Sequence, residues 1–235
     1  MVASTVSSQM LSAIAKAENF TFVDTLPGFK HIGSQSLLLR SQGYKVIFSY
    51  EEAIGYCCGE HVCDKDGITA AAIMGELLLS LYKKNQTLGG YLQHLYDTYG
   101  EFVASNGYYF CDDPQVITRV LNRVRNGGRY LTDVAGYSIA SVRDLGIPGY
   151  DSTRQNFQPT LPTSASSPLV TLHFHNGCVF HLRPSGTEPK FKYYIEMQGK
   201  PGVKREVVLH ELGIMKAALL EEIFQPTKNG LVSGS

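Results

Sequence analysis

Two apolar runs on either side of Asn176-Gly177 constrain the fold of this chain most strongly. Residues 169–175 and 178–183 are rich in β-branched and aromatic side chains. Asn-Gly is the preferred two-residue turn between antiparallel strands, because both positions need a positive φ. The sequence therefore predicts a β-hairpin here.

The register of this hairpin decides whether its histidines and cysteine can form a metal site. With a two-residue turn, His173 pairs with Phe180, and His181 points to the opposite face of the sheet. His175 and Cys178 then share the face of His173. Four ligands cannot converge across a sheet, so we expect no metal site in the hairpin.

We expect the hairpin to belong to a C-terminal α+β domain over residues 105–235, with an antiparallel sheet and flanking helices. Asp112-Asp113-Pro114 is a typical helix start, and an apolar stripe at helical spacing follows it. The further expected elements are strands at 138–144 and 191–197, a long Pro/Ser/Thr-rich loop at 146–168, a helix at 203–224 and a frayed C-terminal tail.

We expect an α/β domain over residues 1–104, because strands and helices alternate there. Asp66 and Thr87 are natural N-caps of two helices. The helix over 68–84 is apolar on most sides, which favours a buried position. The expected order is a strand at 2–6, a helix capped by Ser7-Ser8 that runs to about Ala17, strands at 19–23 and 44–50, and the helix at 68–84.

Composition describes a globular protein of 235 residues. The chain has 21 basic and 21 acidic residues, so a nucleic-acid or membrane-surface partner is not indicated. No apolar run is long enough to span a membrane. Five cysteines, including the adjacent Cys57-Cys58, do not form a disulfide framework and suit a reducing, cytoplasmic compartment.

The residues from Arg183 to Lys190 have the chemistry of a phosphate-binding loop. Ser185 and Thr187 offer hydroxyl groups, and Gly186 lets backbone N–H groups approach an anion closely. Arg183 and Lys190 place a positive charge at each end. An ordinary polar turn between two strands is the alternative interpretation.

Two acidic stretches in the N-terminal half also have more than one interpretation. Glu51 and Glu52 end an apolar strand, so one carboxylate can enter a crevice while the other stays outside; a solvated strand end is the alternative. Asp64-Lys65-Asp66-Gly67 lacks the spacing of a calcium loop and fits a helix cap better. The common nucleophile and nucleotide-binding motifs are missing.

Taken together, these motifs resemble those of the α-D-phosphohexomutase family, the phosphoglucomutases and phosphomannomutases. The loop 183–190 resembles the phosphate-binding loop of the family's fourth domain, and 50–55 the sugar-binding loop of its third domain. The segments 64–67 and 25–30 are similar to third-domain segments that reach the active site and contribute to sugar specificity. The closest branch is the phosphoglucomutase-2 (phosphopentomutase) type with the related glucose-1,6-bisphosphate synthase.

The resemblance implies roles for individual residues. Lys65 would lie near the transferring phosphate or assist proton transfer, and Glu51 would accept hydrogen bonds from sugar hydroxyls. Gly28 and Lys30 would line the sugar pocket. Ala53 stands where many phosphoglucomutases have a sugar-contacting serine. Arg183, Ser185, Gly186, Thr187, Lys190 and Lys192 would bind the phosphate that is not being transferred, with Lys192 at a position where arginine is frequent.

The chain departs from the family in two ways. It contains neither the phosphoserine loop of the first domain nor the Asp-Gly-Asp-x-Asp-Arg magnesium loop of the second. The resemblance therefore implies a C-terminal half with an incomplete third domain, whose opening strand and helix are absent. The Mg²⁺ ligands would lie outside this chain, in N-terminal domains 1 and 2, which would be its partners.

The expected function is substrate recognition in a phosphosugar mutase that acts on a phosphorylated hexose or pentose. Glucose 1,6-bisphosphate would be the activator or intermediate, and the chain alone would not turn over. The alternatives are a fragment of a glucose-1,6-bisphosphate synthase and a non-catalytic phosphosugar-binding protein.

Overall fold

The computed structural model describes residues 1–234 and divides into two compact units. Unit 1 comprises Met1–Phe102 together with Lys200–Gly202. Unit 2 comprises Val103–Gly199 and the residues from Val203 onward. Each unit has its own sheet and its own hydrophobic core, so each is described by itself.

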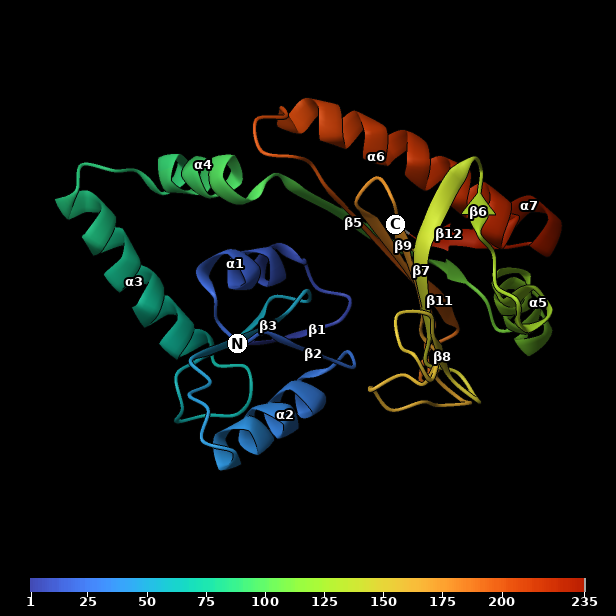
Figure 1. Cartoon of the computed structure of the whole chain (residues 1–235), viewed down its shortest axis with the longest axis horizontal. Coiled ribbons are helices and arrows are strands. Elements are labelled where there is room, and N and C mark those ends of the chain that lie inside the picture. Colours follow the sequence, from blue (N-terminus) through green and yellow to red (C-terminus); the bar gives the residue numbers. More distant parts are fainter. Residues whose placement is uncertain (235) are drawn as a thin grey trace. The chain divides into compact units, whose positions relative to one another are not determined.

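Unit 1 is an α/β domain around a four-stranded sheet of order β2-β1-β3-β4 (Figure 1). The central strand β1 pairs in parallel with β2 and β3, and β4 pairs antiparallel with β3. The strands are β1 (Val2–Ser4), β2 (Val23–Thr25), β3 (Phe48–Glu51) and β4 (Gly55–Cys58). The helices are α1 (Met10–Glu18), α2 (Phe29–Ser41), α3 (Gly67–Lys83) and α4 (Leu88–Tyr99).

The core of unit 1 is small and lies between the sheet and α2. Its buried apolar residues come from β1, α2, the approach to β3, and β4: Val2, Phe29, Ile32, Leu39, Val46 and Cys57. Neither α2 nor β4 was predicted from the sequence. Gly33, Ser34, Ser36 and Ser41 weaken the apolar pattern of α2, so its helical period is faint.

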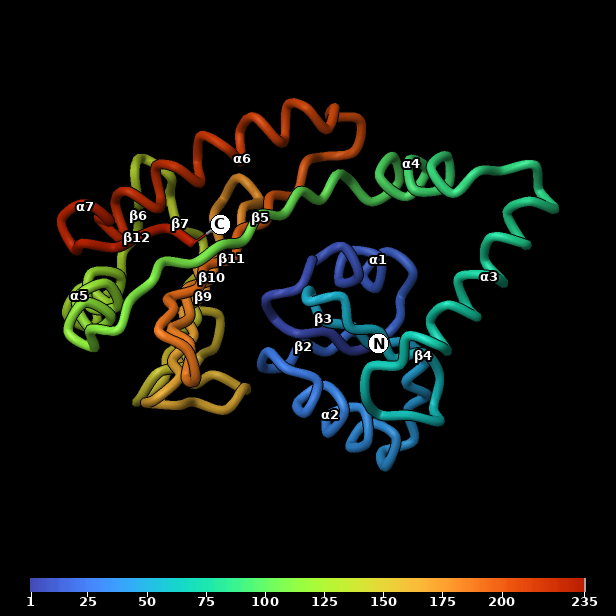
Figure 2. The backbone as a smooth tube through the Cα atoms, turned by 180° about the vertical axis from the view of Figure 1, so that it is seen from behind, coloured from blue at the N-terminus to red at the C-terminus, as the bar shows by residue number. Residues whose placement is uncertain are grey.

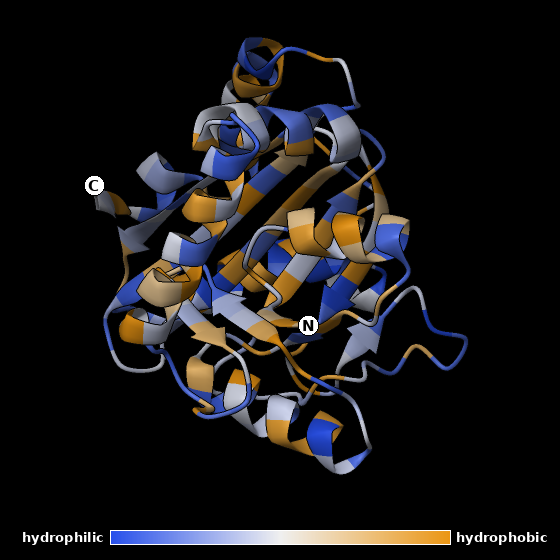
Figure 3. Cartoon of the chain, turned by 90° about the vertical axis from the view of Figure 1, so that its left-hand side faces the viewer, coloured by the Kyte–Doolittle hydropathy of each residue, from blue (hydrophilic) through white to orange (hydrophobic). Residues whose placement is uncertain are grey.

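The expectation that the helix over 68–84 is buried was wrong. Among its residues only Leu81 is buried, whereas Ile68 is 85% and Tyr82 79% exposed. Orange and blue bands alternate along the helices in Figure 3, so the helices contain both apolar and polar residues. A largely apolar cavity of about 610 Å³ separates part of α3 from β3 and β4. An all-round apolar helix therefore does not guarantee burial within one domain.

Unit 2 is an α+β domain around an eight-stranded sheet. The order is β12-β5-β11-β10-β9-β7-β6, and β8 pairs with β7 outside this path. The strands are β5 (Phe102–Phe110), β6 (Asp133–Val134), β7 (Tyr137–Asp144), β8 (Tyr150–Asp151), β9 (Val170–Phe174), β10 (Cys178–Pro184), β11 (Lys190–Gln198) and β12 (Val232–Gly234). The helical segments are α5 (Pro114–Arg125), the 3₁₀ turn η1 (Asn126–Gly128), α6 (Arg205–Leu219), the π-helical turn η2 (Leu220–Phe224) and α7 (Pro226–Asn229).

The hairpin of β9 and β10 exists, but its predicted register was wrong by one residue. Val179 pairs with His173 and His181 with Thr171, so the connection contains His175 as well as Asn176-Gly177. Because strand side chains alternate between faces, this slip puts His173 and His181 on the same face. His181 is buried there, with its Nδ1 3.0 Å from the hydroxyl of Thr171. Burial, then the charges of His173 and Arg143, lowers the pKa of His181 well below 6.5.

The other face of this sheet shares one hydrophobic core with α5 and α6. Phe180, Leu182 and Ile195 from the sheet belong to the same cluster as Val120 of α5 and Met215 of α6. The predicted start of α5 is confirmed, since Asp113 accepts a hydrogen bond from Gln115 N.

The expectation of a frayed C-terminal tail was wrong for the described residues. After α7, β12 pairs antiparallel with β5, as their neighbouring paths in Figure 2 show. Val232 pairs with Phe110, and Gly234 with Tyr108. In the part of the chain from 1 to 234, no helix combines the length and hydropathy needed to cross a membrane.

Candidate functional site

In unit 1, the structure brings Lys65 and Glu51 together around Gly55. Lys65 lies in the loop between β4 and α3, and Glu51 ends β3. A Cβ atom added to Gly55 would lie 2.8 Å from Cδ of Lys65 and 3.0 Å from Cγ of Glu51. Any larger residue at position 55 would force the Lys65 side chain to shift. The predicted acceptor and the predicted cation are neighbours.

The charge of Lys65 is held by two further contacts. Its Nζ lies 3.2 Å from Oδ1 of Asp64 and 4.9 Å from the ring centre of Phe29 in α2. The side chain is half exposed. An ammonium group over an aromatic ring is attracted to it and remains free to donate hydrogen bonds outward. The contact of Phe29 with Lys65 was not predicted from the sequence, because it depends on the helix α2.

Burial raises the pKa of the Glu51 carboxyl, and the nearby charge of Lys65 opposes this shift. The adjacent Glu52 takes a different partner, because its Oε2 accepts a hydrogen bond of 3.1 Å from Ser4. Glu51 can thus accept hydrogen bonds from a hydroxylated ligand while Glu52 supports the fold.

Gly28 and Lys30 flank Phe29 at the start of α2. Gly28 has a φ of +110°, which side chains rarely tolerate, and its carbonyl accepts the first helical hydrogen bonds from His31 and Ile32. Lys30 is exposed in the first turn. Both residues are therefore adjacent in the chain to Phe29, whose ring contacts Lys65. Ala53 lies exposed in the turn between β3 and β4.

Asp66 follows Lys65 and is the N-cap of α3, as the sequence predicted. Its Oδ1 accepts hydrogen bonds from Ile68 N at 3.0 Å and from Thr69 N at 3.3 Å. Hydrogen bonds from the Thr69 hydroxyl and backbone lower the pKa of Asp66. This cap fixes the residue that follows Lys65.

In unit 2, the loop of the predicted phosphate site connects β10 to β11. Ser185 N donates to the carbonyl of Lys190 at 2.8 Å, and Glu188 N donates to Oγ of Ser185 at 3.3 Å. Arg183 of β10 pairs with Lys192 of β11 across the base of the loop. Because paired residues point to the same face, both cations lie side by side.

The loop contains an internal anion that sequence reasoning missed. Oε1 of Glu188 lies 2.8 Å from Nζ of Lys190, and Oε2 lies 3.5 Å from Nζ of Lys192. These lysines lower the pKa of Glu188. Lys190 also lies 4.6 Å from the ring centre of Tyr108 in β5. The sequence signal was the spacing of Glu188 from Lys192, which resembles an i,i+4 ion pair.

Gly186 and Thr187 are exposed at the tip of this loop. No atom lies within 4 Å of a Cβ added to Gly186, so the tip has open space on that side. Together with Arg183, Ser185, Lys190 and Lys192, the loop presents hydroxyl groups and three cations around one turn.

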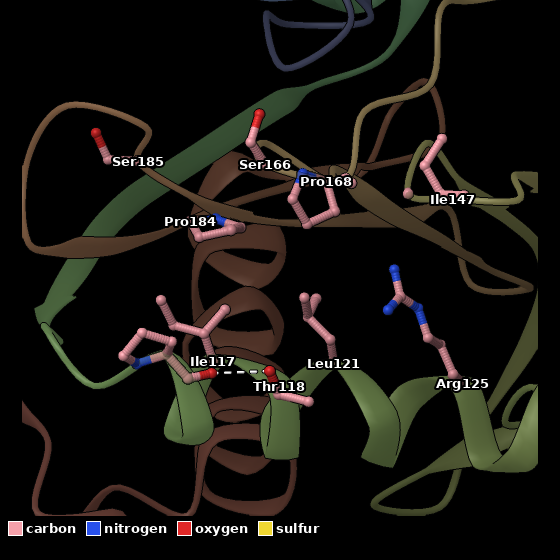
Figure 4. Close-up of a pocket in the computed structure, with 12 residues that line it drawn as sticks. Ile117, Thr118, Leu121, Arg125, Ile147, Ser166, Pro168, Pro184 and Ser185 are labelled. Atoms are coloured by element: carbon pink, nitrogen blue, oxygen red, sulfur yellow. Dashed lines mark hydrogen bonds between the residues drawn. The ribbon is translucent and has the colours of Figure 1, made fainter.

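A cavity of about 350 Å³ borders the start of the loop (Figure 4). Pro184 and Ser185 form one wall, and Ile117, Leu121 and Arg125 of α5 form another. Arg125 is fixed by Asp144, with Nε 2.7 Å from Oδ2 and Nη2 3.2 Å from Oδ1. The cavity has a mixed lining, in which Thr118, Ser166 and Arg125 accompany the apolar side chains.

The described residues contain no group of three or more His, Cys, Asp or Glu side chains that could hold a metal ion. The residues present therefore do not fit the Mg²⁺ that the resemblance implies, and the placement of its ligands outside this chain stays a prediction. The side chains offer hydrogen-bond acceptors for hydroxyl groups in unit 1, and hydroxyl groups and cations suited to an anion in unit 2.

Comparison with known proteins adds three findings. Residues 1–99 match the family model described as phosphoglucomutase/phosphomannomutase, alpha/beta/alpha domain III. Glucose 1,6-bisphosphate synthase of Mus musculus is 43% identical over 236 residues, and phosphopentomutase of Homo sapiens is 41% identical over 235 residues. These alignments cover 99% and 98% of this chain, but the chain spans only 38% of the length of either relative.

A solved structure supports the fold. The exocytosis-sensitive phosphoprotein pp63/parafusin, a phosphoglucomutase from Paramecium in an open form, superposes with a TM-score of 0.64 at 17% identity. The match covers 97% of this chain and 38% of that protein. The similarity extends through both units.

Proposed function

Because this chain belongs to the phosphoglucomutase/phosphomannomutase family, we propose that it is the substrate-recognition part of a phosphosugar mutase. The whole enzyme would interconvert the 1- and 6-phosphates of a hexose, or the 1- and 5-phosphates of a pentose, through a phosphoserine and a bisphosphorylated intermediate. The observation that carries this proposal is the β10–β11 loop, where Arg183, Lys190 and Lys192 surround a hydroxyl-rich turn.

In this proposal, the loop 183–190 binds the phosphate that is not being transferred. Arg183 presents a planar fork of donors, and Ser185, Gly186 and Thr187 add hydroxyl and backbone donors. Phosphoryl transfer depends mainly on positioning and charge neutralisation, which these groups supply.

Unit 1 would bind the sugar. Glu51 would accept hydrogen bonds from its hydroxyl groups, and Lys65 would lie near the transferring phosphate or assist proton transfer. Gly28 and Lys30 would line the pocket. Ala53 offers no hydroxyl, which would alter the sugar preference relative to relatives with serine.

The phosphoserine and the Mg²⁺ site would be supplied by N-terminal domains, and glucose 1,6-bisphosphate would serve as the activator or intermediate. The chain alone would then bind without turnover. The five free cysteines suit a cytoplasmic protein.

The proposal predicts that residues 1–235 bind glucose 1-phosphate or ribose 1-phosphate without converting either. Arg183→Ala should weaken the affinity at least about tenfold, because a charged hydrogen-bond donor to phosphate is lost. Isothermal titration calorimetry measures the affinity, and a coupled mutase assay measures turnover.

The exposed Arg129, also in unit 2, provides a matched control, since Arg129→Ala should leave the affinity unchanged. Equal affinities of the wild type and Arg183→Ala would contradict the proposed phosphate site. Substantial turnover by wild-type residues 1–235 would contradict the proposal that the catalytic groups lie in the N-terminal domains.

A second candidate follows from the identities of the relatives, because the synthase is as similar to this chain as the pentomutase is. The chain would then be part of a glucose-1,6-bisphosphate synthase, or a non-catalytic phosphosugar-binding protein. Release of glucose 1,6-bisphosphate as the main product of a full-length enzyme that contains this chain would favour the synthase, whereas release of a monophosphate would favour the mutase.

A further inference from the structure

One face of α2 contacts the strand and the loop that carry the candidate sugar-binding residues of unit 1. Phe29, Gly33, Ser36 and Arg40 follow the spacing i, i+4, i+7 and i+11, so they lie along a single stripe of the helix. The nearest parts of the site are the strand that ends at Glu51 and the loop that carries Lys65.

Arg40 binds the segment that leads into Lys65. Its Nη1 donates to the carbonyl of Glu60 at 3.0 Å and to Sγ of Cys63 at 3.1 Å. Its Nη2 donates to the carbonyl of Gly59 at 2.9 Å and, more weakly, to that of Val46 at 3.4 Å. One guanidinium group thus joins the end of β4, the following loop and the approach to β3.

Two other residues of the stripe reinforce this arrangement. A Cβ atom at Gly33 would lie 2.2 Å from the carbonyl oxygen of Cys63, so the loop packs directly on the helix backbone. The hydroxyl of Ser36 lies 3.3 Å from that of Ser49, two residues before Glu51. The ring of Phe29 receives the ammonium group of Lys65.

We propose that Arg40 is a positioning residue, which holds residues 59–63 on α2 so that Lys65 stays over Phe29 and beside Glu51. The inference rests on the proposed function, because it assumes that Lys65 and Glu51 contact the sugar phosphate. Lysine cannot replace this arginine, since a single ammonium group cannot reach four acceptors that a planar guanidinium spreads over two nitrogens.

The test compares Arg40→Lys with Arg129→Lys, which makes the same chemical change at an exposed site in unit 2. Hydrogen–deuterium exchange of the full chain reports on the loop directly. In Arg40→Lys, the amides of residues 59–66 should exchange about tenfold faster, as the loss of one to two net hydrogen bonds implies. Exchange in α1 should stay unchanged, which separates a local effect from unfolding of unit 1.

Ligand binding provides the second readout. Affinity for glucose 1-phosphate should fall about three- to tenfold in Arg40→Lys, whereas affinity for inorganic phosphate should not change. Arg40→Ala with millimolar ethylguanidinium should recover slow exchange in residues 59–66, a recovery that general destabilisation would not give.

Unchanged exchange of residues 59–66 in Arg40→Lys would overturn the inference. So would faster exchange with undiminished sugar-phosphate affinity, because the loop would then not position a binding group. Absence of any sugar-phosphate binding by the wild type would refute the proposed function and the positioning role, while the exchange data would still decide whether Arg40 holds the loop.

Discussion

At the scale of single residues, Glu188 sets the state of the candidate phosphate loop. Its carboxylate lies between Lys190 and Lys192, the two lysines that a phosphate would approach. Because its pKa is lowered from 4.5, it is ionised at neutral pH. An incoming anion must therefore displace this internal carboxylate or share the lysines with it.

Glu188→Gln should strengthen binding of inorganic phosphate about two- to fivefold, because it removes a competing charge at an exposed site. The salt dependence of binding should become steeper, since two cations lose their internal partner. Calorimetry at two ionic strengths measures both effects.

Glu206→Gln removes an exposed acid of α6 and serves as the control for net charge. Weaker binding in Glu188→Gln than in the control would mean that Glu188 organises the loop instead of competing with its ligand.

Residue types predicted the candidate groups, but not their partners. The hydroxyl groups and cations of 183–190 follow directly from the sequence, and the structure places them around one turn. The contact of Lys65 with Phe29 and the bonds of Arg40 join positions that are far apart in the chain. No local pattern reports such contacts, because they depend on how α2 packs against the loop.

At the scale of elements, caps could be predicted well and register could not. Asp66, Thr87 and Asp113 cap their helices as expected, since a cap is a local hydrogen bond. The β9–β10 hairpin has one more residue in its connection than the Asn-Gly rule suggests, and this moves His173 to the face of His181.

The cap at Asp66 leads to a test at this scale. Asp66→Ala should shorten α3 at its start and lower the melting temperature of unit 1, because two backbone donors lose their acceptor. Asp66→Asn should retain most of the stability. Circular dichroism during thermal unfolding measures the difference.

The pH dependence of this cap has a defined sign. Folding lowers the pKa of Asp66 from its ordinary value of 3.8. The contribution of the Asp66 carboxylate to stability is therefore fully present above pH 3.8 and is lost as the pH falls through the lower pKa of the folded state. The stability gap between the wild type and Asp66→Ala should therefore narrow in that acidic range. A gap that stays constant down to the folded value would contradict the assignment of the cap.

At the scale of the whole molecule, the two units have cores of different size. The cluster in unit 1 is built from a few residues around Ile32, whereas that in unit 2 extends through the sheet, α5, α6 and η2. Hydrophobic stabilisation grows with the apolar area buried, so unit 2 should be the more stable unit.

Differential scanning calorimetry should accordingly show two transitions. Ile32→Ala should lower the temperature of the first transition, and Leu182→Ala that of the second. Each substitution should reduce the free energy of unfolding of its unit by about 2–5 kcal/mol. Both side chains are completely buried. A single transition that both variants shift equally would show that the units unfold together.

The α/β and α+β fold classes could be anticipated because strand and helix alternation differs between the two halves of the chain. The extent of the second sheet could not be anticipated. Strands β5 and β12, at one side of the sheet, pair although they are far apart in sequence. The alternation of buried and exposed residues in β5 is too weak to predict a strand.

The pairing of β12 with β5 matters for handling this protein in the laboratory. A Cβ atom on Gly234 would lie 2.1 Å from the ring of Tyr108, and that ring supports the ammonium group of Lys190 in the phosphate loop. An affinity tag or fluorophore attached directly after this strand would adjoin Gly234, which packs beside Tyr108, the ring under Lys190. Labels intended to leave ligand binding undisturbed belong elsewhere on the surface.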